Sequence, residues 1–508
     1  MGQVIGIDLG TTYCAMAALT VGGLPEIIPN REGERITPSV VLFQGEIVIV
    51  GSQAKRSAAS APQDTVQFVK RHMGEKSILY TTDGGEDFRP EQISALILRR
   101  LKEDAELHFG EPVDQAVITV PAYFDDARRT ATRDAGTIAG FEVLRVLNEP
   151  TAAAIAYGAR NADAGTFLVY DLGGGTFDVT VMRSTDGELD VLSTAGDRNL
   201  GGYNWDNALM NHIDAQVVAA GSAAVLDGDE ALVAELRDKA EIAKRTLSTG
   251  EQASVVLSVA GAHHHIKITR ATFEQLTAKL LARTELLTSQ ALEEAGLTWQ
   301  QIDRVLLVGG STRMPMVGHM MERLSGRVAE RGVAQDEVVA MGAAILAAAH
   351  AGSGTNGLAE ATGGVITAVN DVTSKSLGIV TQADSGRSVN SVIVERNTRL
   401  PCKGVRQFGT ASPDQRLINA RVTEGDDEDL EYVTVIGQAE IRIPVPGLPA
   451  GHPVDIALSY DIDAIIHVQV SDGRTGQAWG EFEIERTANM DSGQLRVAGE
   501  LMSGQEVV

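Results

Sequence analysis

The sequence predicts an α/β protein whose final part changes to an all-β unit, and three observations carry this prediction. Up to about residue 350, short apolar strand patterns such as QAVITVP and RVLLVGGS alternate with amphipathic helical patterns, which is typical of α/β folds. Residues 352–364 break the alternation with glycine, serine and threonine and indicate a linker. Beyond residue 370, runs such as EIRIPVPG and VDIALSY indicate short strands between turn residues, which favours a β-sandwich.

The predicted boundaries follow these changes of pattern. We expect an α/β domain over residues 1–351, a linker over 352–370, a β-sandwich over 371–487 and a short tail over 488–508. At about 150 residues per domain, the 508 residues correspond to roughly three domain-sized units. The tail pattern suits either one short helix or a disordered end.

Two helices of the first domain are predicted from the spacing of their apolar residues. The first spans residues 92–110, ends at a glycine, and carries the stripe Ile93, Leu96, Ile97 and Leu101. The second spans residues 229–249 and has an apolar stripe opposite a polar one, which consists of Glu241, Lys244, Arg245 and Ser248. A polar stripe on a helix is ordinarily a solvated face, so its spacing alone assigns no ligand to it.

Composition and charge exclude several classes of function. The net charge is −25 and no run of basic residues occurs, which argues against nucleic acid and anionic membranes as partners. The longest apolar stretches, such as MGAAILAAAHA, are too short to span a bilayer. Two distant cysteines, Cys14 and Cys402, and a start without a secretory signal favour a reducing compartment, so we expect a cytoplasmic protein.

One unusual loop occurs twice in the chain. In FLVYDLGGGTFDVTV (167–181), three glycines and Thr176 offer N–H and O–H donors to a polyanion, and Asp171 precedes them at the strand end. A carboxylate would repel phosphate unless a cation stood between them, which points to Mg²⁺ held through water. VIGIDLGTTYCAMAA (4–18) repeats this arrangement with Asp8, Thr11 and Thr12. A single glycine run is more often a tight turn, but the repetition favours two turns that face each other around phosphates.

A third glycine-rich turn, VGGSTR at residues 308–313, also follows a strand. It brings Arg313, whose guanidinium could cover a nucleotide base or ribose. None of the three turns has the Walker spacing of glycines, lysine and hydroxyl.

The motifs, taken in order along the chain, resemble those of the heat shock protein 70 chaperones, the DnaK family. They are GIDLGTTYC, AVITVPAYFDDARRTATRDAGTIAG, LNEPTAAAIAYG, VYDLGGGTFDVTV, NLGG, AKRTLS, VLLVGGSTRMP and DEVVAMGAAI, and looser matches such as DVTSKSLGIV continue into the β unit. The resemblance implies a two-lobed, actin-like ATPase domain with duplicated ribonuclease-H-like cores, followed by a peptide-binding β-sandwich. It also implies hydrolysis of MgATP to ADP and phosphate.

The resemblance implies roles for individual residues of the first domain. Five residues would take part in hydrolysis, by ordering the attacking water and offsetting the charge of the γ-phosphate. They are Lys70, Glu149, Asp171, Thr176 and Asp178. Asp8 and Asp171 would hold Mg²⁺ through its waters. The remaining nucleotide contacts would be Thr11, Thr12, Tyr13, Gly174, Gly175, Glu241, Lys244, Arg245, Ser248, Gly309, Gly310, Ser311, Arg313 and Asp336.

In the β unit, the resemblance implies a cleft for extended apolar segments of unfolded proteins. It would be lined by Ile379, Phe408, Ala411, Ile418 and Ala420, for which ordinary sandwich core is the alternative. Coupling between ATP and peptide would use Pro121, Arg129, Arg145 and Asp371. A J-domain co-chaperone and a nucleotide exchange factor are the implied partners.

Two departures from the family pattern leave a second function open. Val369 is the only bulky residue where the family has an apolar linker, and we expect the helical lid after the sandwich to be missing. The alternative to an ATP-driven chaperone is a nucleotide-switched binding scaffold in which hydrolysis has little use.

Overall fold

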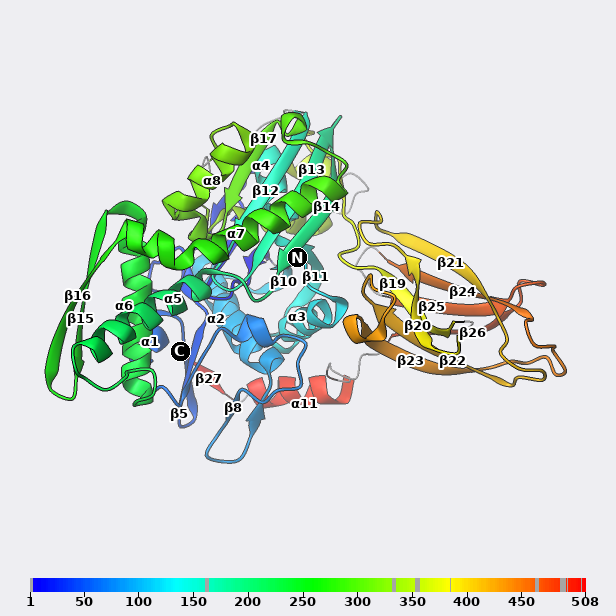
Figure 1. The fold of residues 1–508 in the computed structure, drawn as a ribbon, viewed down its shortest axis with the longest axis horizontal. Helices are drawn as coiled ribbons and strands as arrows, with labels where there is room; N and C mark the ends of the chain where they lie inside the picture. Colours follow the sequence, from blue (N-terminus) through cyan, green and yellow to red (C-terminus); the bar gives the residue numbers. More distant parts are fainter. Residues whose placement is uncertain are drawn as a thin grey trace. The chain divides into compact units, whose positions relative to one another are not determined.

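The computed structural model describes residues 3–159, 164–330, 335–351, 357–383, 385–461, 466–484, 490, 492–503 and 505–508 (Figure 1). The chain divides into two compact units. Unit 1 comprises Met1–Phe124, Arg128–Val369 and Met490–Val508, and unit 2 comprises Asp125–Ala127 and Asn370–Asn489. No helix in the described ranges combines the length and the apolar character needed to cross a membrane.

One sheet of unit 1 is organised around its first strand. The strand order is β11-β10-β1-β2-β3, with β4 paired to β2. Strands β10 and β11 run parallel to β1, whereas β2 forms an antiparallel hairpin with it. The bounds are β1 (Gln3–Asp8), β2 (Tyr13–Leu19), β3 (Pro25–Ile27), β4 (Thr37–Pro38), β10 (Val113–Val120) and β11 (Glu142–Asn148). The first of the two repeated loops is the turn between β1 and β2.

A second sheet repeats this arrangement. Its order is β17-β12-β13-β14-β18; β17 runs parallel to β12, and β13 forms an antiparallel hairpin with β12. The bounds are β12 (Gly165–Leu172), β13 (Phe177–Thr185), β14 (Glu188–Asp197), β17 (Arg304–Val308) and β18 (Ala368–Asn370). The second repeated loop joins β12 to β13, so the duplication in the sequence corresponds to a duplicated sheet.

Two helices pack so closely that glycine is required between them. Helix α9 (Val338–Ala351) is apolar on all sides, as expected for a helix surrounded by protein, and it contacts α4 (Glu149–Gly158), β1 and β2. An ideal Cβ on Gly342 would lie 1.8 Å from the carbonyl oxygen of Ala152 in α4, and one on Gly6 would lie 2.0 Å from the backbone nitrogen of Ala344. This contact fixes the start of α4, where Glu149 lies.

The other helices of unit 1 pack on its sheets or on one another. The predicted helix over 92–110 is α2, whose stripe Ile93, Leu96, Ile97 and Leu101 is completely buried and which ends at Gly110 with φ 71°. Helix α7 packs on β13 and β14. The bounds are α1 (Ser52–Ser57), α2 (Pro90–Phe109), α3 (Asp126–Ile138), α5 (Gly202–Ala219), α6 (Glu230–Thr249), α7 (Arg270–Glu294), α8 (Pro315–Ser325) and α10 (Gly357–Ala361).

A smaller sheet in unit 1 includes the end of the sequence. Its order is β27-β6-β5-β7, and β27 follows the helix α11 (Ser492–Ser503); both are red in Figure 1. The bounds are β5 (Val40–Gln44), β6 (Ile47–Val50), β7 (Thr65–Gln67) and β27 (Glu506–Val507). Two hairpins complete the unit: β8 (Tyr80–Thr81) with β9 (Asp87–Phe88), and β15 (Gln252–Val259) with β16 (Ala262–Thr269).

Unit 2 contains two four-stranded antiparallel sheets, in the orders β20-β19-β22-β23 and β21-β24-β25-β26. Alternate residues of both sheets, among them Leu377, Val422, Leu458 and Val468, form one buried core. The bounds are β19 (Leu377–Gln382), β20 (Ser388–Val394), β21 (Cys402–Gly409), β22 (Leu417–Glu424), β23 (Thr434–Arg442), β24 (Pro453–Tyr460), β25 (Ile466–Asp472) and β26 (Ala478–Glu483). The predicted fold class, an α/β unit with two similar sheets followed by a β-sandwich, is confirmed.

Candidate functional site

Unit 1 contains a cavity of about 700 Å³ between the two larger sheets and helix α6. Its lining residues come from positions as far apart as 8 and 339. They include most of the site residues that the sequence singled out: Asp8, Thr11, Thr12, Tyr13, Lys70, Glu149, Asp171, Gly174, Thr176, Glu241, Lys244, Arg245, Ser248, Gly309, Gly310, Ser311, Arg313 and Asp336. Gly175 and Asp178 are not among the lining residues.

The two repeated loops lie directly against each other at the cavity. An ideal Cβ on Gly174 would lie 2.3 Å from Oγ1 of Thr12, and one on Gly175 would lie 2.4 Å from Cγ2 of Thr11. Contacts this short leave no room for a side chain at either glycine. The glycines are therefore needed for the close approach of the two turns.

Helix α5 and the third turn both form hydrogen bonds to the glycine loop, residues 173–176 between β12 and β13. The carbonyl oxygens of Gly173 and Gly174 accept the N–H groups of Gly202 and Tyr203, at 2.9 and 2.7 Å. The hydroxyl of Ser311 donates to the same Gly173 oxygen at 2.9 Å. These bonds join the glycine loop, the start of α5 and the third turn into one wall of the cavity.

A buried ionic cluster lies beside the two loops. Lys70 and Glu149 form an ion pair and are only 3% and 7% exposed. Asp171 and Asp178 are buried in the same region, and Asp8 is half-buried there. The Asp178 carboxylate accepts the backbone N–H of Tyr123 at 3.0 Å. Four carboxyl groups therefore share one ammonium group.

The pKa values of three of these carboxyl groups are raised. Burial, with the charge of Glu149 as the second cause, raises the pKa of Asp8 to about 7 and that of Asp178 to about 7. The same two causes raise the pKa of Asp171 well above its usual range. Burial opposes the charge of Lys70, but the attraction of Glu149 and Asp8 outweighs it and raises the pKa of the ammonium group. Lys70 is therefore charged at neutral pH.

The chemistry of this cluster suits a hard cation held at some distance. Carboxylate oxygens are the donors that Mg²⁺ prefers, and a bound cation would lower the repulsion between Asp8 and Asp171. Within the described residues, no three His, Cys, Asp or Glu side chains converge closely enough to bind an ion directly. Asp8 and Asp171 fit a magnesium ion that keeps its water ligands.

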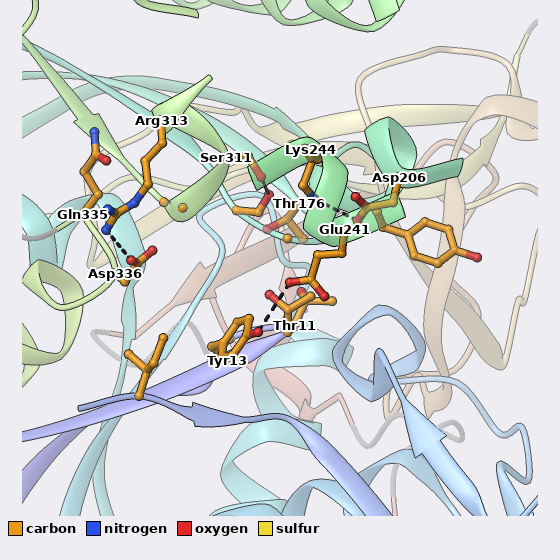
Figure 2. Close-up of a pocket in the computed structure, with 18 of the residues that line it drawn as sticks. Thr11, Tyr13, Thr176, Asp206, Glu241, Lys244, Ser311, Arg313, Gln335 and Asp336 are labelled. Atoms are coloured by element: carbon orange, nitrogen blue, oxygen red, sulfur yellow. Dashed lines mark hydrogen bonds and ion pairs between the residues drawn. The ribbon is translucent and has the colours of Figure 1, made fainter. Parts of the chain in front are cut away.

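Helix α6 forms one wall, and the four residues of its polar stripe line the cavity. Figure 2 shows two of them, Glu241 and Lys244. Glu241 accepts hydrogen bonds from Lys55 at 2.7 Å and from Tyr13 at 3.4 Å. Lys55 and Arg245 each donate to the Tyr13 hydroxyl at 2.7 Å. This cluster ties α1, β2 and α6 together across the cavity. Burial opposes both charges of the pair, but their attraction prevails, so the pKa of Lys55 is raised and that of Glu241 is lowered.

The same helix also braces the glycine loop. Lys244 donates to the Asp206 carboxylate at 2.8 Å and to the carbonyl oxygen of Gly202 at 3.2 Å. Opposite, Arg313 pairs with Asp336 at 2.5 Å, and the backbone of Gly310 lies close beneath that carboxylate. Figure 2 shows the two ion pairs at opposite sides of the cavity.

Several residues at the cavity were not anticipated from the sequence. Phe68, Tyr203, Asp206 and Arg237 line it. Lys55 does not line it but bonds to two residues that do, Tyr13 and Glu241. The Phe68 and Tyr203 rings meet edge to face with centroids 4.8 Å apart, and the Arg237 guanidinium lies 4.7 Å from the Tyr203 ring. Lys55 and Asp206 are recognisable only through their charged partners. Phe68 has φ 59° directly before the short helix that carries Lys70, and no local pattern marks a non-glycine residue for that conformation.

The residues expected to couple the two units lie in both of them. In unit 1, Arg129 bonds to Asn148 and to the carbonyl oxygen of Phe124, Pro121 is buried, and Arg145 lies half-buried on β11. In unit 2, the Asp371 carboxylate accepts the N–H of Val372 at 2.9 Å.

The five expected cleft residues differ in burial. Ile379 and Ala420 are buried in the sandwich, Phe408 and Ile418 are partly buried against its core, and Ala411 is exposed. The sandwich-core alternative therefore describes Ile379 and Ala420 well. Phe408, Ile418 and Ala411 retain surface that a peptide could contact.

A family model described as Hsp70 protein matches residues 4–496 of the 508-residue chain. The match spans unit 1 and unit 2 together.

Proposed function

The chain belongs to the Hsp70 family, which makes it a chaperone of the Hsp70 type, and we propose that it hydrolyses MgATP to regulate its binding of unfolded polypeptides. The observation that carries this proposal is the contact of the Thr11–Thr12 turn with the Gly174–Gly175 turn at the cavity. Two donor-rich turns in contact, beside a lysine and an excess of carboxylates, suit a triphosphate with its magnesium ion.

The rest of the cavity suits the nucleoside. Its volume of about 700 Å³ falls within the range of small-molecule sites, about 300–1,000 Å³. We assign the adenine and ribose to the space between the polar stripe of α6 and the third turn. The side chains there are Glu241, Lys244, Arg245, Ser248, Ser311, Arg313 and Asp336, with the backbone of Gly309 and Gly310.

Asp8 and Asp171 would hold Mg²⁺ through its waters, and the ion would neutralise phosphate charge when bound. Ionisation of these carboxylates favours the ion, and the ion in turn favours their ionisation. Asp8 is the last residue of β1, and Asp171 is the last but one of β12. The two sheets therefore set their positions.

Hydrolysis needs position and charge rather than covalent catalysis by the protein. Lys70 is charged and held by Glu149, so its ammonium group can offset the negative charge that develops on the transferred phosphoryl group. Glu149, Asp171 and Asp178 would orient the attacking water, and Thr176 would donate to a phosphate oxygen.

For the peptide, we propose that unit 2 binds an extended apolar segment through backbone hydrogen bonds and a shallow apolar contact. The side chains proposed for this contact are Ile379, Phe408, Ala411, Ile418 and Ala420. Pro121, Arg129, Arg145 and Asp371 are proposed to couple peptide binding to the nucleotide state. A J-domain co-chaperone would stimulate hydrolysis, and an exchange factor would release ADP.

The deciding experiment measures ATP turnover of the full chain alone, with an unfolded apolar peptide, and with peptide plus a J-domain protein. Stimulated turnover supports the proposal. An indifferent rate together with nucleotide-dependent peptide binding would instead identify a nucleotide-switched scaffold. Failure to bind MgATP in calorimetry would refute both functions.

A further inference from the structure

The end of the sequence belongs structurally to the nucleotide-binding unit. Residues 492–503 and 505–508, here called the return segment, form α11 and β27 within unit 1. Unit 2 comprises residues 370–489 together with three residues near 126. The chain therefore enters the sandwich from unit 1 and runs back into unit 1 after it.

The return segment supplies a strand to the outer edge of β6. β27 pairs in parallel with β6, with Glu506 opposite Ile47 and Val507 opposite Val48. The N–H of Val508 donates to the carbonyl oxygen of Val48 at 2.8 Å, and the carbonyl oxygen of Val508 accepts the N–H of Val50 at 2.9 Å. Backbone groups at a sheet edge that would otherwise bond to water are satisfied by this added strand.

Apolar side chains hold the return segment on one face. Val507 and Ala498 are 6% and 3% exposed and belong to the same core as Val48, Val50 and Leu96. Their neighbours Val508 and Val497 are 38% and 57% exposed. Buried and exposed side chains thus alternate along the return segment, as in an amphipathic peptide bound to an apolar surface. Its backbone forms hydrogen bonds at one end, and its buried side chains make the remaining contacts.

The strand that receives it leads directly to the cavity. β6 ends at Val50, and after Gly51 the chain forms α1, which carries Lys55. Lys55 bonds to Tyr13 and Glu241, which line the cavity on β2 and on α6. The bond between Val508 and Val50 thus lies five residues before the side chain that bridges the cavity.

We propose that the edge of β6 is a strand-acceptor site whose ligand is the return segment, and that its occupancy holds Lys55 in place and slows nucleotide release. The part about release rests on the proposed function. Detachment of the return segment frees β6 and α1, weakens the Lys55 bridge, and opens the cavity.

The first test compares Val507→Asp with Val508→Asp in the full chain. Both place the same charge at the end of β27, but only the first lies in the apolar core. Hydrogen–deuterium exchange is measured at the Val50 amide and along α11, with strands β12 and β13 as the control for intact folding. We expect Val507→Asp to abolish protection at Val50 and α11 and Val508→Asp to preserve it. Equal protection at Val50 in both variants would overturn the proposal.

The second test measures release of fluorescently labelled ADP from the same two variants. We expect release from Val507→Asp to be about five- to tenfold faster, which is the lower part of the range typical of coupling between two sites. Unchanged release despite a detached segment would overturn the link to the cavity. If even the wild-type chain bound no nucleotide, the proposed function would fail, and the exchange data would still decide whether the segment occupies β6.

A cross-linked variant covers the case in which Val507→Asp fails to fold. Ile47→Cys with Glu506→Cys places two thiols at positions that the register sets opposite each other. We expect the oxidised protein to form this disulfide, mapped by mass spectrometry, and to release ADP no faster than the wild-type chain. No cross-link under oxidising conditions would contradict the proposed docking.

Discussion

Replacement of Lys70 by alanine tests the ionic cluster most directly, because it separates stability from catalysis. The substitution leaves Glu149 buried without its cation, next to Asp8, Asp171 and Asp178. Removal of one partner from a buried ion pair typically costs about 3–5 kcal/mol. We expect a loss of this size in the free energy of unfolding of unit 1 at pH 8.

The loss should shrink as the pH falls. Burial raises the folded pKa of Asp8 and Asp178 to about 7, from 3.8, so their protonated forms stabilise the folded state at low pH and that contribution is lost as the pH rises through 7. Lys70 lowers both pKa values in the wild-type chain. Without it they rise further, and the penalty of Lys70→Ala is therefore larger at pH 8 than at pH 5.

Hydrolysis should respond differently from stability. With its ammonium group gone, we expect Lys70→Ala to keep nucleotide binding but to lose about 10²–10³ in single-turnover rate, as is typical when one electrostatic stabiliser of a transition state is removed. The double variant Lys70→Ala/Glu149→Gln removes the orphaned charge as well. It should recover most of the stability and none of the hydrolysis.

The assay combines denaturant unfolding, followed by the fluorescence of the buried Trp205, with single-turnover hydrolysis at pH 5 to 8. Lys76→Ala is the matched control, because Lys76 is exposed and six residues further along the chain. Wild-type hydrolysis by Lys70→Ala would refute the catalytic role. A stability loss independent of pH would refute the account of the buried carboxylates.

Three further predictions follow from the same geometry. Lys55→Ala should release labelled ADP several-fold faster while Lys55→Arg keeps most of the bridge, and equal rates for the two would show that the bridge does not restrain the nucleotide. Magnesium-dependent nucleotide binding, measured by calorimetry, should strengthen as the pH rises through about 7. The carboxyl groups of Asp8 and Asp178, whose pKa values are raised to about 7, must ionise to attract the cation. An affinity that does not change from pH 6 to 8 would contradict this. Gly342→Ala should destabilise unit 1 by about 3 kcal/mol or more, because its Cβ would lie 1.8 Å from the backbone of α4. Gly499→Ala, where the added Cβ meets nothing within 4 Å, should be neutral or stabilising by up to about 1 kcal/mol, and similar unfolding midpoints for the two glycine variants would refute the packing argument.

The fold class and the repeated turns could be predicted because their signals are local. A glycine-rich turn between two apolar strands predicts a hairpin, and the same pattern in 4–18 and 167–181 predicted the duplicated hairpins that the two sheets contain. The apolar stripe of α2 was likewise sufficient to predict a buried helix and its end at Gly110. The family is confirmed by the match over residues 4–496. The individual roles of the site residues stay predictions.

Other features have no local signal. Lys55 and Asp206 are ordinary charged residues until Glu241 and Lys244, 186 and 38 residues away, become their partners. The return segment was left as a helix or a disordered end, because pairing with β6 joins residues more than 450 positions apart. Contacts of that kind depend on how the whole chain folds, and no window of neighbouring residues contains them.

By itself, the sequence determined the alternation of strands and helices up to about residue 350, the short strands beyond residue 370 and the repeated bare turns, because hydrophobic period and glycine content act on neighbouring residues. It also determined that Glu241, Lys244, Arg245 and Ser248 share one face of α6. Only the tertiary structure decided that this face lines a cavity, and that residues 506–508 complete the edge of β6. The physical reason is that burial and charge pairing belong to the assembled surfaces, whereas periodicity belongs to the chain.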